Sequence, residues 1–321
     1  MIAIHRSALR GRPHTEGAPA PSSQHGCAED DGWGFREGDE IVSGRHAIRL
    51  LGGGSRYEAY LAWDDDLHSL VVAKILRPNK VLERSALRGL ATEKRDLDAL
   101  QHPVLLRCFD AVLDGPSPHL VLEFLEGPRL STLLRKYGRL ALEQVIPLGL
   151  QLCSALHYMG TREVLHLDVK PENIVMGAPP RLIDLSVACS FEEGCRLDHL
   201  VGTDAYMSPE QCDPAGFGGV GPEADVWGLG VTLYEAATGA HPFLRSQLGD
   251  AGLDENMPQS HLDPLPLPDD FPRLLGEPIL ACLERRPEDR PRPSEVSVAL
   301  EELVATLPRQ PVLGKFKPKL R

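Results

Sequence analysis

The spacing of apolar residues changes at Gly127-Pro128, and this change constrains the fold more than any other feature. Before it, short apolar-rich runs such as 57–63 and 70–76 alternate with turn residues. Such runs predict strands, because successive strand side chains point to opposite faces of a sheet. After it, apolar residues recur at helical spacing over four segments: 143–160, 223–238, 272–285 and 293–306. We therefore expect an α+β fold, with a small sheet-rich lobe followed by a larger helical lobe.

Smaller elements set the expected boundaries of these two parts. Further strands are predicted at 45–51, 107–113 and 118–124, and a single helix at 83–100. The proline-rich acidic stretch 244–272 is typical of a surface loop. The first residues are rich in Gly, Pro, Ala and Ser, which predicts a disordered tail. The expected division is a tail over 1–38, a first lobe over 39–125, a second lobe over 126–307 and a short basic tail over 308–321.

Composition narrows the classes of function. The net charge of −12 argues against general nucleic-acid binding, which normally needs a basic footprint. No apolar run approaches the roughly 20 residues of a membrane span, so a soluble, cytoplasmic protein is expected. The seven cysteines are scattered without a C-x-x-C pair, which is typical of reduced thiols. No pattern in the sequence indicates an oligomeric state.

One run carries most of the chemistry: His166-Leu167-Asp168-Val169-Lys170-Pro171-Glu172-Asn173. A second acid, Asp184, follows it between apolar neighbours. Phosphoryl transfer needs a carboxylate that orients a hydroxyl, oxygen ligands for Mg²⁺ and a cation near the transferred phosphate. Asp168 can orient the hydroxyl, and Lys170 can supply the cation. Asn173 and Asp184 can supply the oxygen ligands. The spacing therefore fits phosphoryl transfer assisted by Mg²⁺.

Two features of the first lobe agree with this chemistry. Gly52-Gly53-Gly54-Ser55 is a candidate phosphate-binding loop, because glycine lets backbone amides approach oxygens closely. A strand is predicted after it, whereas a dinucleotide-binding fold would need a helix. Lys74 lies among apolar residues of a predicted strand, and a buried cation needs a partner. Glu93, on the predicted helix, is the partner that we expect.

Together these motifs resemble the protein kinase family over about residues 39–307, and in particular the eukaryotic-like (Hanks-type) bacterial serine/threonine kinases. The resemblance implies a bilobal fold, ATP with Mg²⁺ (Mn²⁺ being an alternative), and protein Ser or Thr hydroxyls as acceptors. The catalytic residues that it implies are Asp168, Lys170, Lys74, Glu93 and Thr203. The metal ligands that it implies are Asn173 and Asp184. The nucleotide-binding residues that it implies are Gly52, Gly53, Gly54, Ala59, Val72, Lys74, Glu123, Leu125, Asn173 and Asp184.

The resemblance also implies how these residues act. Lys74 would hold the α and β phosphates, and Thr203 would bridge Asp168 and Lys170. Ala59 and Val72 would contact one face of the adenine ring, and the backbone at Glu123 and Leu125 would bind its edge. Among the scaffold residues, Glu210 would pair with Arg290. Asp225 would brace the catalytic loop, which is the run 166–173.

Three positions depart from the family pattern. Tyr57 replaces the third glycine of the phosphate loop, which predicts a stiffer loop. Ser186 replaces the glycine two residues after Asp184. Leu167 replaces the arginine that pairs with an activation-loop phosphate in many kinases. Residues 191–202 also contain no Ser, Thr or Tyr, so we expect activity that is independent of phosphorylation in that stretch.

Two other functions compete with an active serine/threonine protein kinase. The three departures favour a pseudokinase that binds nucleotide or acts as a scaffold. The shared catalytic core would also suit a small-molecule kinase of the aminoglycoside type, although Lys170, Glu210 and Asp225 argue against it. Transfer of labelled phosphate from ATP to protein would favour the protein kinase over the pseudokinase. Transfer to aminoglycosides or small alcohols, with none to protein, would favour the small-molecule kinase.

Overall fold

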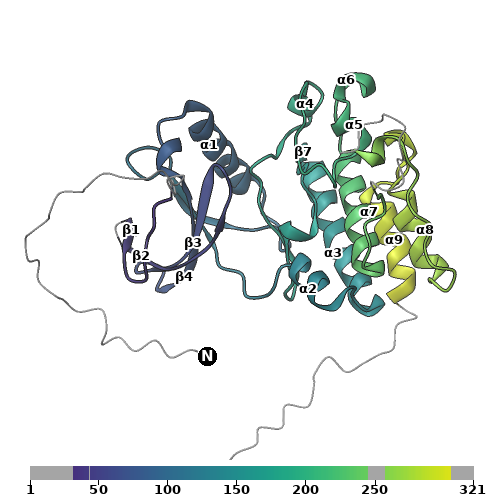
Figure 1. The fold of residues 1–321 in the computed structure, drawn as a ribbon, viewed down its shortest axis with the longest axis horizontal. Helices are drawn as coiled ribbons and strands as arrows, with labels where there is room; N and C mark the ends of the chain where they lie inside the picture. The colour runs from purple at the N-terminus through teal and green to yellow at the C-terminus, as the bar shows by residue number, and fades with distance from the viewer. Residues whose placement is uncertain (1–31, 43, 245–256, 305–321) are drawn as a thin grey trace, which may run out of the picture. The chain divides into compact units, whose positions relative to one another are not determined.

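The computed structural model of the protein describes residues 32–42, 44–244 and 257–304. These residues divide into two compact units (Figure 1). The first contains the residues up to Lys94 together with Cys108–Phe124, and the second contains Arg95–Arg107 together with the residues from Leu125 onward. The first carries a six-stranded sheet and the second most of the helices, so the predicted α+β class is confirmed. The tail predicted over 308–321 lies outside the described residues.

The segment 95–107 belongs to the second unit, although it falls within the stretch expected for the first lobe. Backbone hydrogen bonds explain this difference. The Leu182 amide donates to Val104 O at 2.7 Å, and the Leu106 amide donates to Leu182 O at 3.2 Å. This pairing between residues far apart in the chain is not visible in a local hydrophobic pattern.

The strands of the first unit form one antiparallel sheet in the order β1-β2-β3-β4-β6-β5. Their bounds are β1 Glu40–Val42, β2 Arg45–Gly53, β3 Tyr57–Asp64, β4 Ser69–Leu76, β5 Cys108–Val112 and β6 His119–Glu123. Between β3 and β4, Tyr60 lies opposite Ala73 and Ala62 lies opposite Val71. These four side chains are buried on one face of the sheet. The alternation in the sequence thus corresponds to one core-facing side, as the two-residue repeat of a strand requires.

Two aromatic residues just before β1 contradict part of the prediction of a disordered tail. The expected disorder over 1–38 is wrong for Trp33 and Phe35, which pack against the core of the sheet. The Trp33 indole N–H donates to Leu76 O at 2.7 Å, and its ring stacks on Phe35 with 5.5 Å between the centroids. Phe35 in turn meets the edge of Tyr60 at 5.4 Å. Partial burial of these two large rings against the sheet offsets the entropy cost of ordering a glycine-rich segment.

The bounds of the helices are α1 Arg84–Ala99, α2 Leu130–Tyr137, α3 Leu142–Thr161, α4 Phe191–Gly194, α5 Pro209–Cys212, α6 Pro214–Phe217, α7 Glu223–Thr238, α8 Arg273–Ala281 and α9 Pro293–Val304. Helices α1, α3, α7, α8 and α9 follow the five predicted helical segments with shifted ends, whereas the shorter helices α2, α4, α5 and α6 fall outside those segments. In the second unit, α3 packs against both α7 and α9. Helix α8 ends at Ala281, short of the predicted end at 285. Arg285 and Arg286 lie beyond it, before a 3₁₀ turn at Pro287–Asp289.

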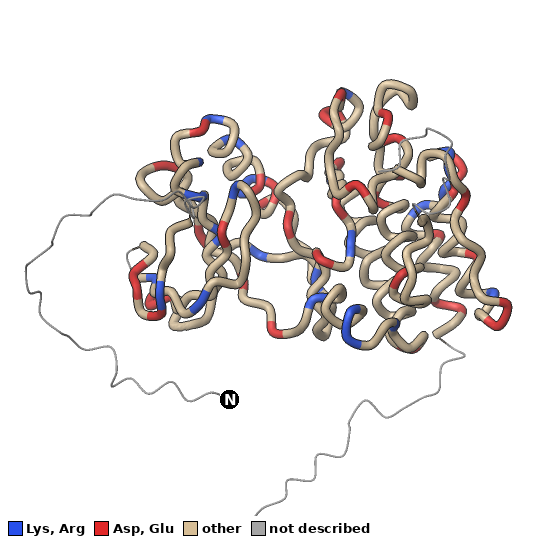
Figure 2. The backbone as a smooth tube through the Cα atoms, in the orientation of Figure 1, with Lys and Arg blue, Asp and Glu red and all other residues tan. Residues whose placement is uncertain are grey.

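Short strand pairs frame the loops of the second unit. β7 (Val164–Leu165) pairs with β10 (Cys189–Ser190), and β8 (Ile174–Val175) pairs with β9 (Arg181–Leu182). Acidic and basic residues are scattered along the backbone of both units (Figure 2). None of the helices among the described residues has the length and apolar character needed to cross a membrane.

Candidate active site

Asp168 lies at the centre of a hydrogen-bonded group in the second unit. The Thr203 hydroxyl donates to Asp168 Oδ1 at 2.7 Å. The Lys170 ammonium lies 2.7 Å from Asp168 Oδ2 and also donates to the Thr203 hydroxyl. The predicted bridge by Thr203 between Asp168 and Lys170 is therefore present. It orients both carboxylate oxygens and places a positive charge beside them.

Asn173 is buried and turned toward the same carboxylate. Its amide nitrogen donates to Asp168 O at 2.9 Å and to Asp168 Oδ2 at 2.8 Å. Because the nitrogen end of the planar amide is directed at Asp168, the oxygen end points away from it. The backbone oxygen of Asn173 accepts a hydrogen bond of 2.8 Å from the backbone amide of Ile183, across the base of the β8–β9 hairpin. This bond brings the backbone of the two predicted metal ligands, Asn173 and Asp184, to neighbouring positions.

Two residues of the site adopt a left-handed backbone. Leu167 has a φ of 61° and Asp184 a φ of 70°. This conformation is uncommon for residues other than glycine and is found preferentially at functional sites, where it costs about 1–3 kcal/mol. The Ser186 amide approaches Asp184 Oδ1 at 3.4 Å. The segment Asp184-Leu185-Ser186 therefore keeps a specific turn, with serine in place of the family's glycine.

Asp225, in the first turn of α7, braces the catalytic loop as predicted. Its two carboxylate oxygens accept the backbone amides of His166 and Leu167, each at 2.7 Å. Burial raises the pKa of Asp225, and the opposing effects of the nearby His166 and of these two amide bonds do not cancel the increase. The residue thus fixes the backbone immediately before Asp168.

The predicted ion pair between Glu210 and Arg290 is confirmed. It is bidentate, with Arg290 Nη1 and Nη2 at 2.6 and 2.8 Å from the two Glu210 oxygens. Both side chains are almost completely buried, and the guanidinium also lies over the Trp227 ring at 4.9 Å. Arg290 further donates to the backbone oxygens of Glu223 and Glu284. The pair therefore links Glu210, at the end of the activation segment (residues 184–210), to α7 and to the chain before α9.

An apolar cluster surrounds Leu167, the residue in the position of the family's arginine. The buried members of this Leu167 cluster are Leu165, Leu167, Val220 and Ala224, and partly buried side chains packed on it are Val187, Cys189, Phe191, Leu197 and Val201. Five of these nine residues come from 187–201, the stretch that follows Asp184. The activation segment is therefore packed against the catalytic loop by apolar contacts.

Two buried glutamines were not singled out from the sequence. Gln211 Nε2 donates to Leu167 O at 3.0 Å and to Val201 O at 2.8 Å. Gln259 Nε2 donates to Asp204 O at 2.7 Å and to Met207 O at 3.1 Å. Gln259 lies in the stretch 244–272 that was expected to be a surface loop, and it is only 1% exposed. That expectation is wrong for this residue, whose side chain is held inside the fold by hydrogen bonds from its amide nitrogen to two backbone oxygens of the activation segment.

In the first unit, the expected pairing of Lys74 with Glu93 is confirmed. Lys74 Nζ lies 2.7 and 2.9 Å from the two oxygens of Glu93 on α1. The side chains are 12% and 2% exposed, so the pair is largely removed from water. Ala59 lies opposite Lys74 in the β3–β4 register, and Val72 lies two residues before Lys74. These three side chains therefore share one face of the sheet.

The glycine loop is a hairpin turn, as predicted, with strands on both sides. Gly52 has a φ of 151°, which favours glycine. The Gly54 amide donates to Tyr57 O at 3.0 Å and closes the turn. Arg77 Nε donates to Gly54 O at 2.7 Å and ties the loop to the end of β4. Of the residues expected at the adenine edge, Glu123 ends β6 in the first unit and Leu125 belongs to the second unit.

Comparison with known proteins agrees with the resemblance to protein kinases that the sequence motifs indicate. The sequence model described as "Protein kinase domain" matches residues 45–299. The serine/threonine-protein kinase PknB of Mycobacterium leprae is 29% identical over 253 residues, which cover 75% of this chain and 40% of that protein. The serine/threonine-protein kinase Pkn1 of Myxococcus xanthus is 31% identical over 256 residues, which cover 76% of this chain and 36% of that protein. The chain thus spans about two fifths of the length of these curated relatives. Since the domain match covers well over half of the sequence, the chain belongs to the protein kinase family.

Proposed function

We propose that this protein is an ATP-dependent serine/threonine protein kinase whose activity does not require phosphorylation of its activation segment. The observation that carries the proposal is the bond from the Thr203 hydroxyl to Asp168 Oδ1. It demonstrates that this carboxylate accepts an aliphatic hydroxyl at hydrogen-bonding distance. A substrate serine or threonine presents the same chemical group.

In the proposed reaction, the acceptor hydroxyl oxygen forms a bond to the γ-phosphorus of ATP. The bond from that phosphorus to the β–γ bridging oxygen breaks, and ADP leaves with the electron pair. Asp168 orients the hydroxyl and receives its proton, a role worth roughly 10²–10⁴ in rate. Lys170, 2.7 Å from the carboxylate, offsets negative charge that gathers near the transferred group.

The residues expected to hold a divalent cation fit that task. Asn173 directs its amide nitrogen to Asp168, which leaves an oxygen at the other end of the amide. Amide and carboxylate oxygens are the ligands that Mg²⁺ prefers, so Asn173 and Asp184 form a suitable donor set. Mg²⁺, or Mn²⁺ in its place, would neutralise charge on the ATP phosphates. We assign Lys74 to the α and β phosphates, the turn Gly52–Gly54 to backbone contacts with them, and Ala59, Val72, Glu123 and Leu125 to adenine.

The Leu167 cluster supports independence from phosphorylation. An arginine at position 167 would need an anion nearby, whereas leucine is stabilised by the apolar side chains that pack on it. The cluster draws most of its members from the activation segment itself. Apolar burial therefore orders that segment in the absence of an added phosphate.

Transfer of ³²P from [γ-³²P]ATP to a generic basic protein, in the presence of Mg²⁺, tests the proposal. We expect transfer by wild type, and a loss of roughly 10²–10⁴ in Asp168→Asn. Asp270→Asn removes an exposed carboxylate from a loop and is the matched control, which keeps wild-type activity. Wild-type protein that binds ATP but transfers no phosphate would contradict the proposal and favour a pseudokinase. Transfer to aminoglycosides alone would favour a small-molecule kinase.

A further inference from the structure

Tyr57 stands at the position of the third glycine of the family's phosphate loop, and its ring lies beside the Lys74–Glu93 ion pair. The distance from Lys74 Nζ to the centroid of the Tyr57 ring is 4.8 Å. Within the sheet, Tyr57 pairs with Leu76, two residues beyond Lys74, so the ring and the ammonium lie on the same face. A cation at this distance from an aromatic face is attracted by the ring quadrupole.

The other end of the ring reaches helix α1. A Cβ built on Gly89 would lie 3.4 Å from the Tyr57 hydroxyl oxygen and 3.5 Å from Arg56 Nη1. Glycine is unfavourable inside a helix, but here it leaves room for the tyrosine. Gly89 is one turn before Glu93, so both residues face the sheet from the same side of α1. Tyr57 therefore contacts Lys74 on β4 and α1 beside Glu93 at the same time.

The phenol is neutral at physiological pH. Burial raises the pKa of Tyr57, and the negative charge of Glu93 raises it further, against smaller opposing effects of Lys74 and Arg56. A neutral ring can stabilise the ammonium without competing with Glu93 for a proton. No additional charge is thereby brought into the largely buried pair.

We propose that Tyr57 is a positioning residue that holds Lys74, Glu93 and α1 together in the nucleotide-free kinase. The proposal rests on the proposed role of Lys74 in binding the phosphates of ATP. If the ion pair is formed in only a fraction of the molecules before ATP binds, the apparent affinity for ATP is the intrinsic affinity multiplied by that fraction. In this chain, the ring keeps the pair formed beforehand. In the family, the third glycine gives the loop conformational freedom. In this chain Tyr57 takes that position, and the backbone of the loop holds its ring against Lys74.

The test separates the ring from the hydroxyl group. Tyr57→Phe removes the hydroxyl group and keeps the aromatic ring, whereas Tyr57→Leu removes the ring and keeps an apolar side chain. We expect the KM for ATP of Tyr57→Leu to rise about three- to tenfold, with kcat within about twofold of wild type, because saturating ATP forms the pair again. Tyr57→Phe keeps both constants within about twofold of wild type. Equal KM values for Tyr57→Leu and wild type, or an equal rise in Tyr57→Phe, would overturn the proposal.

A second readout does not depend on phosphate transfer. Trace acetylation by acetic anhydride, followed by mass spectrometry, reports how accessible and how protonated each lysine amine is. Lys74 in Tyr57→Leu should react about three- to tenfold faster than in wild type or Tyr57→Phe. If the wild-type protein transferred no phosphate, the proposed function would fail, but this ratio would still decide whether Tyr57 positions Lys74. An unchanged ratio in Tyr57→Leu overturns the inference alone.

The chain offers a matched control and an independent perturbation. Lys136 Nζ lies 5.0 Å from the centroid of the exposed Tyr137 ring, outside the site, so Tyr137→Leu should leave Lys74 labelling and the KM for ATP unchanged. Gly89→Ala adds a methyl group at ordinary contact distance from the Tyr57 hydroxyl and should behave like wild type. Gly89→Leu extends into the space of the hydroxyl and should raise Lys74 labelling as Tyr57→Leu does. Wild-type labelling in a folded Gly89→Leu protein would contradict the contact with α1.

Discussion

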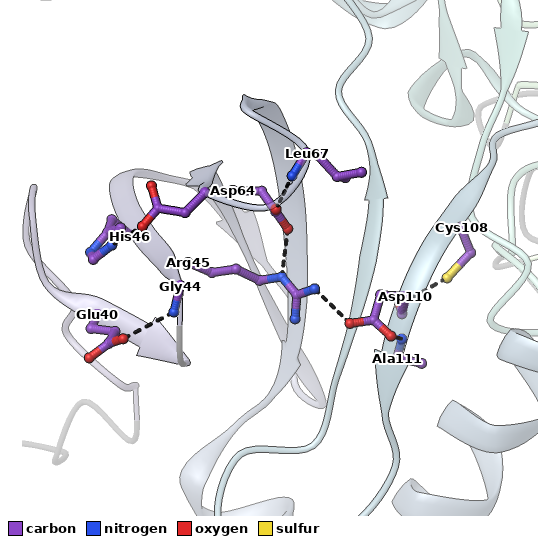
Figure 3. A network of polar contacts seen from close by, with 10 residues as sticks. Glu40, Gly44, Arg45, His46, Asp64, Leu67, Cys108, Asp110 and Ala111 are labelled. Carbon is purple, nitrogen blue, oxygen red and sulfur yellow. Dashed lines mark hydrogen bonds and ion pairs between the residues drawn. The ribbon is translucent and has the colours of Figure 1, made fainter.

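The guanidinium of Arg45 on β2 donates to Asp110 on β5 at 2.6 Å, although β3, β4 and β6 lie between these strands in the sheet (Figure 3). A contact between such distant strands requires a strongly curled sheet. The same guanidinium donates to Asp64 on β3 at 2.7 Å, and Asp64 in turn accepts the Leu67 amide at 2.8 Å (Figure 3). Arg45 thus fixes the curvature of the sheet that carries Lys74.

Replacement of Arg45 should destabilise the fold. Arg45→Met removes the cation but leaves Asp64 with only 1% of its side chain exposed. We expect the free energy of unfolding to fall by about 3 kcal/mol, since a buried carboxylate loses its partner. Urea denaturation measures the loss. Arg49→Met, at an exposed position of the same strand, should change the stability by no more than about 0.5 kcal/mol, and an equal loss in both variants would contradict this role for Arg45.

The same network predicts a dependence on pH. Burial alone would raise the pKa of Asp64, but the Leu67 amide and Arg45 outweigh it and hold that pKa below its ordinary value. A carboxylate with a lowered folded-state pKa stabilises the fold above its unfolded pKa of about 3.9, and this contribution is lost as the pH falls through the folded value. The stability difference between wild type and Arg45→Met should therefore be full at about pH 6 and decrease toward about pH 3. A difference that stays constant over this interval would exclude the linkage.

The buried Arg290 should not tolerate a lysine. Arg290→Lys keeps the charge but loses the bidentate geometry with Glu210 and the donors to the Glu223 and Glu284 oxygens. We expect a loss of about 3–5 kcal/mol in the free energy of unfolding. Thermal unfolding of this variant can be compared with that of Arg286→Lys, whose arginine side chain is 71% exposed. Comparable midpoints for the two variants would refute the structural role of Arg290.

Leu167 offers a direct test of how the activation segment is ordered. Leu167→Ala opens a cavity in the Leu167 cluster and should cost about 2–5 kcal/mol. Limited proteolysis should then cut within 191–202 before the rest of the second unit is degraded. Leu200→Ala, at a residue that is 49% exposed, is the control and should keep the wild-type cleavage pattern. Identical protection of wild type and Leu167→Ala would show that the cluster does not hold the segment.

Local physical rules anticipated much of this structure. Two-residue alternation predicted the strands, and the need of a buried cation for a partner led to the pairing of Lys74 with Glu93. Contacts that depend on tertiary packing were not accessible in this way. Trp33 and Phe35 lie in a glycine-rich stretch and are ordered only by the sheet on which they pack. Gln259 lies within the proline-rich stretch 244–272, and its role depends on backbone groups more than fifty residues earlier. The meeting of Tyr57 with Gly89 requires the register of β3 and the placement of α1 together.

The most direct test of the central claim is a phosphotransfer assay on protein that has first been treated with a phosphatase and shown by mass spectrometry to carry no phosphate. Incubation with [γ-³²P]ATP, Mg²⁺ and a generic protein substrate should then label serine and threonine from the first time points, without a lag. The label should disappear in Asp184→Asn, in which one of the two proposed metal ligands loses its charge. A phosphate-free protein that stays inactive until a residue of its activation segment is phosphorylated would contradict the account.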